Sequence, residues 1–363
     1  MKSALEAIYH IRCEAGAIEE RARAIAVEQS VEMPVAAIED ERVLREIVGE
    51  VCAIRELGNG LFEARIALNA QTTGHDAGQL MNMLFGNASL LEDIVLHDAI
   101  LPPETLAAFG GPRQGIAELK ARVGAARRAL TCSALKPQGL PSTALADLAR
   151  RFAQGGVDYI KDDHGLADQA YSPFVERVEA IAGALRSGGY KTRYVPSLTG
   201  DLDRLRRAVA IARGAGIDTV MLAPMICGVS NMHAVARENP DIAILAHPAL
   251  GGAARIAPPL LIGKLFRLFG AGAVVFPNYG GRFGYSGQTC KALARAALDE
   301  WGAMRPAAPV PAGGMKLQRI PELLDFYGHE VMLLIGGDLL AARERLVEET
   351  KAFVTCVERY AYG

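Results

Sequence analysis

A lysine and three side chains that can bind metal stand together in the segment Gly155-Gly156-Val157-Asp158-Tyr159-Ile160-Lys161-Asp162-Asp163-His164. A Gly-Gly helix stop followed by four β-forming residues predicts a strand that ends in this polar cluster. Because side chains alternate across a strand, Lys161 and Asp163 are expected on one face and Asp162 on the other. A lysine among carboxylates at a strand end is either a structural ion pair or a group that does chemistry.

Other polar or glycine residues follow other predicted strands, namely Lys136-Pro137, His247-Pro248, Arg282, Gly313-Gly314 and Gly336-Gly337. A partly desolvated lysine such as Lys136 can act as a base because its pKa falls. His247 is either structural or a contact to a substrate hydroxyl or a transferred proton. The two Gly-Gly pairs predict a phosphate cradle, since glycine lets backbone N–H groups approach an anion closely.

Strands and amphipathic helices alternate strictly from about Leu130 onward. The expected strands are Thr131–Lys136, Val157–Asp163, Thr192–Ser197, Thr219–Ala223, Ile242–His247, Ala273–Pro277, Val310–Gly313 and Met332–Gly336. The expected helices between them include Ser142–Gln154, Pro173–Ser187, Leu202–Gly214, Gln288–Met304 and Ala341–Glu358. Such a series predicts a (β/α)8 TIM barrel, whose active site lies at the C-terminal ends of its strands.

The earlier part of the chain predicts a separate α+β domain of the ferredoxin-like kind. Strands are expected over Ala4–Arg12, Val51–Leu57 and Leu61–Leu68, and helices over Glu14–Val27 and His75–Leu84. Gly58-Asn59-Gly60 is a favoured hairpin turn. We therefore expect an α/β protein with an N-terminal domain over residues 1–115 and a barrel domain over residues 116–363.

The composition excludes several classes of partner. Half of the 363 residues are hydrophobic, 22% are charged and the net charge is -2, so neither nucleic acid nor an anionic membrane is an expected partner. The basic run Lys120 to Arg128 is expected to be a solvated helix face. Six scattered cysteines without a C-x-x-C motif predict free thiols. Without a signal peptide or an 18-residue apolar run, the expected location is the cytoplasm.

These motifs resemble the large-subunit RuBisCO superfamily, in which Gly-Gly-x-Asp-x-x-Lys-Asp-Asp is characteristic. In that family CO2 carbamylates the lysine, and the carbamate, the second Asp and a following Glu hold Mg2+. The resemblance implies that Lys161 is the carbamate lysine and Asp163 a metal ligand, with His164 in the place of the Glu. Because imidazole suits Mn2+ better than Mg2+, Mn2+ becomes an alternative metal. Lys136 matches the family's first-strand catalytic lysine, and the two Gly-Gly pairs match its phosphate loops.

The resemblance also implies a homodimer with shared active sites. Glu28 and Asn87 match N-terminal-domain residues that reach into the partner's barrel. Several positions depart from the family pattern: Gln138 for a second active-site lysine, Pro248 for an arginine, Phe276 near a phosphate-contacting histidine and Ala312 for a serine. Residues 279–285 lack the lysine that polarises CO2 in carboxylases. The chain therefore resembles the non-carboxylating RuBisCO-like proteins.

One phosphate cradle is kept and residues of the other are lost, which implies a sugar monophosphate substrate. We expect its enolisation or isomerisation, as for 5-methylthioribulose 1-phosphate in methionine salvage, with Lys136 moving protons and a divalent ion stabilising the enediolate. The alternatives are a decarboxylase or a transcarboxylase/hydrolase acting on a branched 3-oxo sugar-acid phosphate, and a catalytically lapsed regulatory or stress-response protein. An aldolase that uses Lys161 as a Schiff base is a further alternative.

Overall fold

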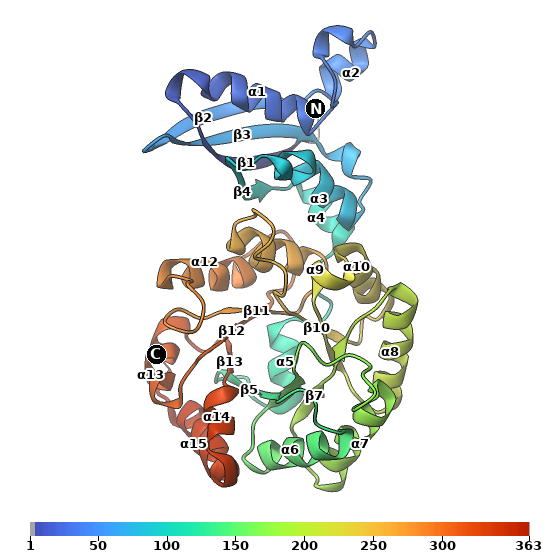
Figure 1. Cartoon of the computed structure of the whole chain (residues 1–363), viewed down its shortest axis with the longest axis vertical. Helices are drawn as coiled ribbons and strands as arrows, with labels where there is room; N and C mark the ends of the chain where they lie inside the picture. The colour runs from blue at the N-terminus through green and yellow to red at the C-terminus, as the bar shows by residue number, and fades with distance from the viewer. Residues whose placement is uncertain (1–3, 363) are drawn as a thin grey trace. The chain divides into compact units, whose positions relative to one another are not determined.

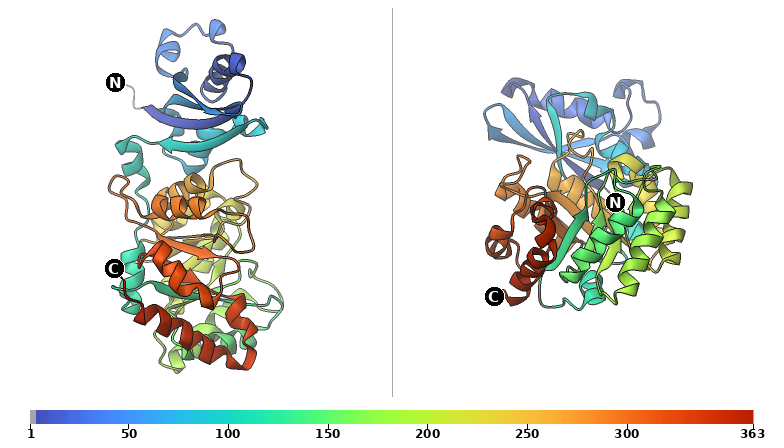
Figure 2. Two further views of the ribbon diagram at one scale, coloured as in Figure 1. Left: turned by 90° about the vertical axis from the view of Figure 1, so that its left-hand side faces the viewer. Right: turned by 60° about the horizontal axis from the view of Figure 1, so that its bottom comes forward.

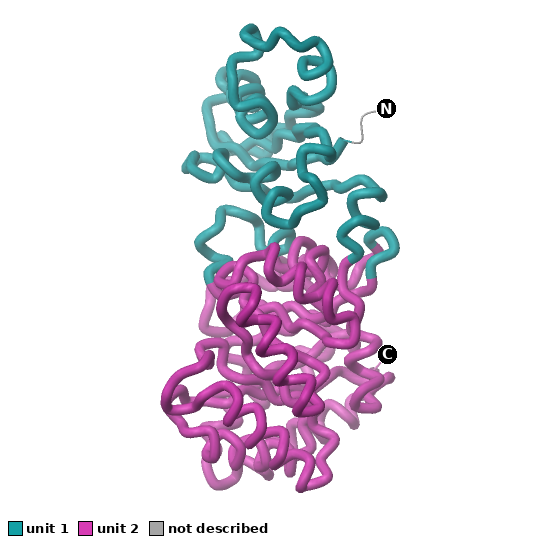
Figure 3. Tube along the Cα trace, turned by 90° about the vertical axis from the view of Figure 1, so that its right-hand side faces the viewer, with its two compact units in different colours: residues 1–110, 250–261, 301–304 teal, residues 111–249, 262–300, 305–363 magenta. Residues whose placement is uncertain are grey.

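The structure is a computed structural model that describes residues 4–362. Its internal contacts divide the chain into two compact units, coloured separately in Figure 3. Unit 1 comprises residues 1–110, 250–261 and 301–304, and unit 2 comprises residues 111–249, 262–300 and 305–363. Residues 250–261 and 301–304, which come much later in the chain, thus belong to the same unit as the N-terminal residues.

Unit 1 is built on a four-stranded antiparallel sheet in the order β2-β3-β1-β4. Its elements are β1 (Ala4–Arg12), α1 (Ile18–Glu28), α2 (Glu41–Glu46), β2 (Glu50–Gly58), β3 (Leu61–Asn69), α3 (Ala77–Phe85), β4 (Ile94–Ile100) and α4 (Pro103–Phe109). The succession of β1, α1, β2, β3, α3 and β4 with this strand order is the ferredoxin-like topology. The expected α+β fold is confirmed.

The sequence pattern of unit 1 explains its hairpin and its core. Asn59, with φ +54° between two glycines that also have positive φ, makes the turn between β2 and β3. Alternate residues of β1, including Leu5, Ala7 and Tyr9, are fully buried, as a strand covered on one face requires. The Asp76 carboxylate accepts a hydrogen bond from the Gln79 N–H (2.8 Å) and caps α3.

Unit 2 contains the parallel strands of a barrel with helices on its outside (Figures 1 and 2). The strands are β5 (Leu130–Leu135), β6 (Tyr159–Asp162), β7 (Arg193–Val195), β8 (Ser197–Leu198), β9 (Thr219–Leu222), β10 (Ala243–Ala246), β11 (Ala273–Pro277), β12 (Ala308–Ala312) and β13 (Met332–Leu334). The helices are α5 (Ile116–Val123), α6 (Ser142–Gln154), α7 (Phe174–Ser187), α8 (Leu202–Gly214), α9 (Pro224–Cys227), α10 (Val229–Glu238), α11 (Phe266–Leu268), α12 (Gly287–Leu298), α13 (Ile320–Tyr327), α14 (Gly337–Ala341) and α15 (Leu346–Arg359).

The strands of unit 2 follow one another around a closed ring. One sheet runs β13-β5-β6-β7 and the other runs β8-β9-β10-β11-β12. Pro196 separates β7 from β8, which are two halves of one strand position, because proline has no N–H to donate to the ladder. β12 lies beside β13, which completes the ring. The predicted TIM barrel is confirmed.

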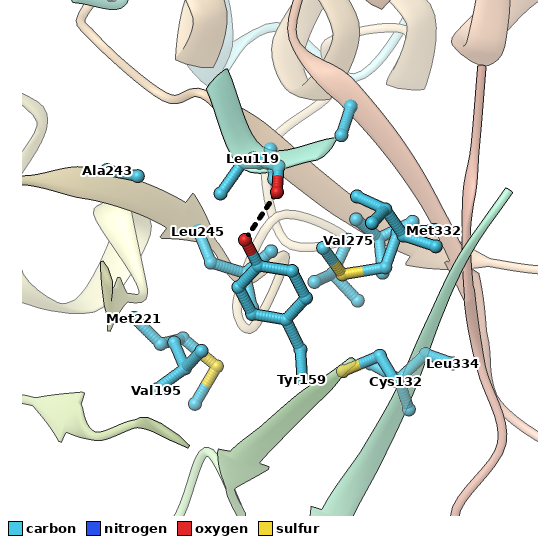
Figure 4. Packing of buried hydrophobic residues seen from close by; sticks show 14 of the residues in the cluster. Leu119, Cys132, Tyr159, Val195, Met221, Ala243, Leu245, Val275, Met332 and Leu334 are labelled. Atoms are coloured by element: carbon cyan, nitrogen blue, oxygen red, sulfur yellow. Dashed lines mark hydrogen bonds between the residues drawn. The ribbon is translucent and has the colours of Figure 1, made fainter. Parts of the chain in front are cut away.

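The barrel interior is filled by small and branched side chains, and Tyr159 lies at its centre (Figure 4). The Tyr159 hydroxyl is buried and donates a 2.8 Å hydrogen bond to the Leu119 carbonyl of α5. A buried tyrosine hydroxyl needs such a partner, and this bond fixes α5 against the N-terminal ends of the strands.

Several sequence expectations need correction. The run from Lys120 is not a solvated helix face, because α5 ends at Val123 and the buried Lys120 ammonium pairs with Glu330 at 2.6 Å. The helix expected to reach Met304 ends at Leu298, since Asp299 is already extended with ψ 151°. The last helix was expected from Ala341, but a short helix and a 3-10 turn precede α15.

All six cysteines are free thiols, as predicted. None of the helices within residues 4–362 combines the length and the hydrophobicity of a membrane span.

Candidate active site

Lys161 is the next-to-last residue of β6, and its side chain is buried, with 4% exposed. Its Nζ donates a hydrogen bond to the Asp162 carbonyl at 2.8 Å. Burial lowers the pKa of Lys161, because removing an ammonium from water disfavours its charged form. Lys161 is therefore closer to a neutral, nucleophilic amine than a surface lysine is.

Asp163 is held from two sides just beyond the end of β6. One carboxylate oxygen accepts from the Lys136 Nζ, and the other lies 2.8 Å from His164 Nδ1. Burial acts to raise the pKa of Asp163. The bonds from His164 and Lys136, with the nearby charges of Lys136 and Lys161, outweigh burial and hold the pKa well below its usual range. Asp163 is thus an ionised carboxylate.

His164 and His247 come from different strand ends and stack face to face. Their ring centroids are 4.3 Å apart and their planes differ by 6°. His247 Nδ1 accepts a 3.2 Å hydrogen bond from the Ala249 N–H. Burial, followed by the charge of Lys161, lowers the pKa of His247 to about 2. His247 is therefore neutral at ordinary pH. The side chain of His164 is 46% exposed, so this ring of the stacked pair is the more accessible to solvent.

Asp162 points away from this cluster, as the alternation of strand residues predicts. Its fully buried carboxylate accepts from Arg177 Nε (3.1 Å), the Tyr194 hydroxyl (2.7 Å) and the Ser197 N–H (3.0 Å). Arg177 also donates to the carbonyls of Ala167 and Ser172. The ion pair of Arg177 and Asp162 thus fixes the loop that carries Asp163 and His164.

Two of the predicted glycines serve the packing of neighbouring loops. Gly313 and Gly314 follow β12 with φ +85° and +92°, values that other residues rarely adopt. A Cβ on Gly314 would lie 3.0 Å from Arg282, and one on Gly313 would lie 3.1 Å from the Phe283 ring. The Arg282 N–H donates to the Gly313 carbonyl at 3.0 Å. The loop after β11 therefore rests on these glycines.

Gly336 and Gly337, after β13, have no such structural requirement. Neither has a positive φ, and a Cβ on Gly337 would meet nothing within 4 Å. The two loops are joined, because Asp338 accepts a 2.9 Å hydrogen bond from the Leu317 N–H. The space beside Gly337 is open, as a ligand site would be.

Arg282 is an exposed residue of the loop after β11. Among the cations predicted for the site, it is the nearest in sequence to the loops after β12 and β13. Its guanidinium lies 5.5 Å from the centroid of the Phe283 ring. Within residues 4–362 it has no carboxylate partner among the ion pairs of the structure. Arg282 can therefore offer its donors to an anion.

Gln138, which the resemblance sets at the position of a family lysine, covers the loop after β6. A Cβ on Gly165 would lie 1.7 Å from the Gln138 amide nitrogen. The side chain of Gln138 therefore lies directly on the Gly165 backbone, and any larger residue at 165 would displace it. This contact gives Gln138 a packing role that a sequence motif does not reveal.

Glu28 and Asn87 meet within unit 1. The Asn87 side-chain amide donates to Glu28 (2.8 Å) and to Glu32 (2.9 Å). Sequence reasoning missed Glu32 and the neighbouring Gln29, a buried amide that donates to the carbonyls of Asn82 and Met83. Gln29 also accepts from the Ala88 N–H (3.0 Å), which ties the segment before and after Asn87 to α1.

No group of three His, Cys, Asp or Glu side chains within residues 4–362 is arranged to hold a metal ion. Asp163 is the carboxylate of the cluster, because Asp162 faces Arg177 instead. A metal ion at this position would therefore need further ligands, from a modified Lys161, a substrate or water.

Comparisons with known proteins identify the family of the chain. Residues 115–257 match the family model of the ribulose bisphosphate carboxylase large chain, catalytic domain. The chain is 60% identical over 362 residues to a 5-methylthioribulose-1-phosphate isomerase of Rhodospirillum rubrum, covering 98% of this chain and 97% of the relative. The chain belongs to the RuBisCO large-chain family.

Other relatives place it within that family. It is 32% identical over 353 residues to a 2,3-diketo-5-methylthiopentyl-1-phosphate enolase of Geobacillus thermodenitrificans, with 90% of this chain and 85% of the relative covered. A crystal structure of a Rubisco-like protein from Rhodopseudomonas palustris superimposes with a TM-score of 0.93 at 51% identity, and both chains are covered fully. The protein is a RuBisCO-like enzyme of the non-carboxylating, isomerase and enolase branch.

Proposed function

We propose that this RuBisCO-like enzyme isomerises a sugar monophosphate, with 5-methylthioribulose 1-phosphate as the first candidate, in methionine salvage. The observation that carries the proposal is the Lys136 amine held on the Asp163 carboxylate beside the buried Lys161. The similarity to an isomerase of that name over nearly the whole chain supports the choice of substrate.

Lys136 is the proposed proton carrier. Its side chain is 38% exposed, so it can reach a substrate at the end of the barrel while Asp163 fixes its position. Once it has given up its own proton, a positioned lysine can take a proton from the carbon next to a carbonyl and return it to the neighbouring carbon. The neutral His247 is the second candidate, because an uncharged imidazole can accept a proton or orient a substrate hydroxyl.

A divalent ion would be held by Lys161 as its carbamate, by Asp163 and by His164. The donor set fits such an ion in two respects: Asp163 is ionised, and burial favours the neutral amine of Lys161 that reacts with CO2. When bound, the ion polarises the carbonyl and hydroxyl oxygens of the substrate. Mg2+ prefers oxygen ligands, so His164 makes Mn2+ an alternative.

The substrate phosphate is assigned to the loops after β12 and β13. Gly337 leaves open space, a Cβ on Gly336 would make only an ordinary contact with Ala134, and Arg282 supplies an exposed cation on the adjoining loop. Gly313 and Gly314 hold that adjoining loop in place through their contacts with Arg282 and Phe283. A single phosphate-binding site at these loops suits a substrate with one phosphate group.

Glu28 and Asn87 are proposed to complete the site of a partner subunit in a homodimer. Their hydrogen-bonded pair lies at the surface of unit 1, and Gln29 fixes it from beneath. Both N–H donors of Asn87 are used by Glu28 and Glu32, so the acceptors that remain are the Asn87 amide oxygen and the other lone pairs of the Glu28 carboxylate, which suit the donors of substrate hydroxyls.

Enolisation of 2,3-diketo-5-methylthiopentyl 1-phosphate is the second candidate, which the relative of that name supports. It would also begin with loss of a proton beside a carbonyl.

The purified protein should be incubated with each of the two sugar phosphates in D2O, and the reaction followed by 1H and 31P NMR. Conversion of 5-methylthioribulose 1-phosphate with deuterium incorporation supports the isomerase. Turnover of the diketone alone would favour the enolase, and inertness toward both would overturn the proposal.

A further inference from the structure

A cavity of about 530 Å³ lies in unit 2, among residues at the start of β7 and just before β9. These are the N-terminal ends of the barrel strands, opposite to the ends that carry Lys161 and His247. The volume falls in the range of ordinary small-molecule sites. The cavity is thus distinct from the candidate active site.

The charges around this cavity are unbalanced. Four cations line it, namely Arg122, Arg186, Lys191 and Arg193, and Asp218 is the single carboxylate among the lining residues. Asp218 is already shared, since it lies 3.6 Å from Arg122 and 3.3 Å from Arg193. Three positive charges therefore remain without a counter-charge in the lining, which favours an anionic occupant.

Part of this basic lining has a structural role. Arg122 donates to the carbonyls of Asp218 and Asp241 and to the side chains of Thr219 and Gln114. Its donors are used, so Arg122 contributes charge to the cavity but no free N–H. Arg186 likewise donates to the Ala215 carbonyl at the end of α8 (2.6 Å).

Other donors have no structural role. Arg193 Nε is buried and has no hydrogen-bond partner, although buried N–H groups are normally satisfied. The exposed Lys191 has no ion pair or hydrogen bond within the part of the chain that the structure describes. The other donors of Arg193 are engaged with Asp218 and the Arg122 carbonyl, so Nε is its one nitrogen without a partner. An anion bound in the cavity would give Lys191 a partner directly, and would reach Arg193 Nε after a turn of that side chain.

The rest of the lining is apolar or aromatic, including Leu185, Tyr190 and Ile217. Inorganic phosphate alone would leave these surfaces without a partner. We propose that the cavity binds a phosphate monoester, with its phosphate on Lys191, Arg186 and Arg193 and its organic part against Tyr190 and Ile217. Such a site is separate from the sugar-phosphate site and does not depend on the proposed reaction.

Calorimetric titration with ribose 5-phosphate at 0.15 M salt tests the proposal. Because the proposed active site also takes a phosphate, the titrations should use the Gly337→Leu background and be repeated in the wild type. Lys191→Met should weaken the binding that remains in Gly337→Leu by about tenfold or more, as the loss of a charged hydrogen bond does. The double change Arg186→Met and Lys191→Met should abolish it.

Arg207→Met is the matched control, because Arg207 is an exposed arginine of α8 outside the cavity lining. It removes one charge and should leave the affinity unchanged. Thermal unfolding of each variant checks the fold. The proposal is overturned if Gly337→Leu binds no ribose 5-phosphate, or if Lys191→Met and Arg207→Met weaken binding equally. Failure of the active-site assignment alone would leave the Lys191-dependent binding intact.

Discussion

The imidazole of His164 lies parallel to that of His247, with ring centroids 4.3 Å apart and planes 6° apart. His164 also bonds to Asp163, so the residue that the resemblance sets at the family's glutamate position is fixed on two sides. A glutamate at this position could not stack on His247. The substitution is therefore part of a local arrangement that involves the ends of β6 and β10.

The first prediction concerns the pH dependence of stability. The pKa of His247 is about 2 in the folded protein, against about 6.5 for an unperturbed histidine. Between these values the unfolded chain binds more protons, so the free energy of unfolding falls as the pH falls below about 6.5. His247→Asn should reduce this slope, to which one group contributes at most about 1.4 kcal/mol per pH unit.

Urea denaturation between pH 4.5 and 6.5, in CO2-free buffer without divalent ions, measures this slope. Asp163 contributes only in the acid part of this range, because its lowered pKa affects stability from about pH 5 downward, and this contribution is present in both proteins that are compared. His75→Asn is the control, since His75 is exposed and its φ of +55° suits asparagine. Equal slopes in the wild type and His247→Asn would contradict the prediction.

The second prediction concerns Lys136. Lys136→Met should reduce kcat by about 10²–10⁴-fold, the usual contribution of one general acid–base group, with substrate still bound. Exchange of the substrate's acidic proton with D2O should disappear in parallel. Lys351→Met on α15 controls for loss of a lysine elsewhere. Exchange that persists in Lys136→Met would make His247 the base.

The strand ends could be predicted well from the sequence, because each ends in a residue of recognisable type. Pro137 cannot continue β5, and β6 ends at Asp162, one residue before the predicted end. The positions of Lys136, Lys161 and Asp163 at one end of the barrel follow directly from the fold. The predicted alternation of Asp162 and Asp163 also holds.

Contacts between distant elements could not be predicted in this way. Arg177 lies on a helix with a polar and an apolar face, where an arginine is normally solvated, yet its guanidinium is buried on Asp162. Gln29 looks like an ordinary residue after α1, and its partners lie near Asn87. Such pairs depend on tertiary packing, for which a single sequence has no periodic signal.

The third prediction separates two kinds of glycine. Gly337→Leu should fold with an unchanged Tm, because its Cβ meets nothing and its φ is not positive. It should nevertheless raise KM for a sugar phosphate at least tenfold by filling the phosphate space. Gly314→Ala should instead lower the Tm, since its φ of +92° and the nearby Arg282 both oppose a Cβ. An unchanged KM in folded Gly337→Leu would remove the phosphate assignment.

The last prediction concerns the metal. Asp163 is the carboxylate available in the cluster, because Asp162 is committed to Arg177 and Tyr194. An unmodified Lys161 is a cation or a buried amine and adds no oxygen ligand. Binding of Mg2+ or Mn2+ should therefore require bicarbonate, with affinity about tenfold or more weaker in CO2-free buffer. Electron paramagnetic resonance of Mn2+ measures the bound ion, and 13C NMR with labelled bicarbonate detects the carbamate.

Two variants make this test specific. Lys161→Met should lose both the 13C carbamate signal and the bicarbonate dependence of metal binding. His164→Glu should tighten Mg2+, since it replaces an imidazole by the charged oxygen ligand that Mg2+ prefers. Arg177→Met is not a suitable control, because it leaves the buried Asp162 unpaired and should unfold the loop that carries the site. Metal affinity that is equal with and without CO2, in a protein that still has Lys161, would show that the ion does not depend on a carbamate.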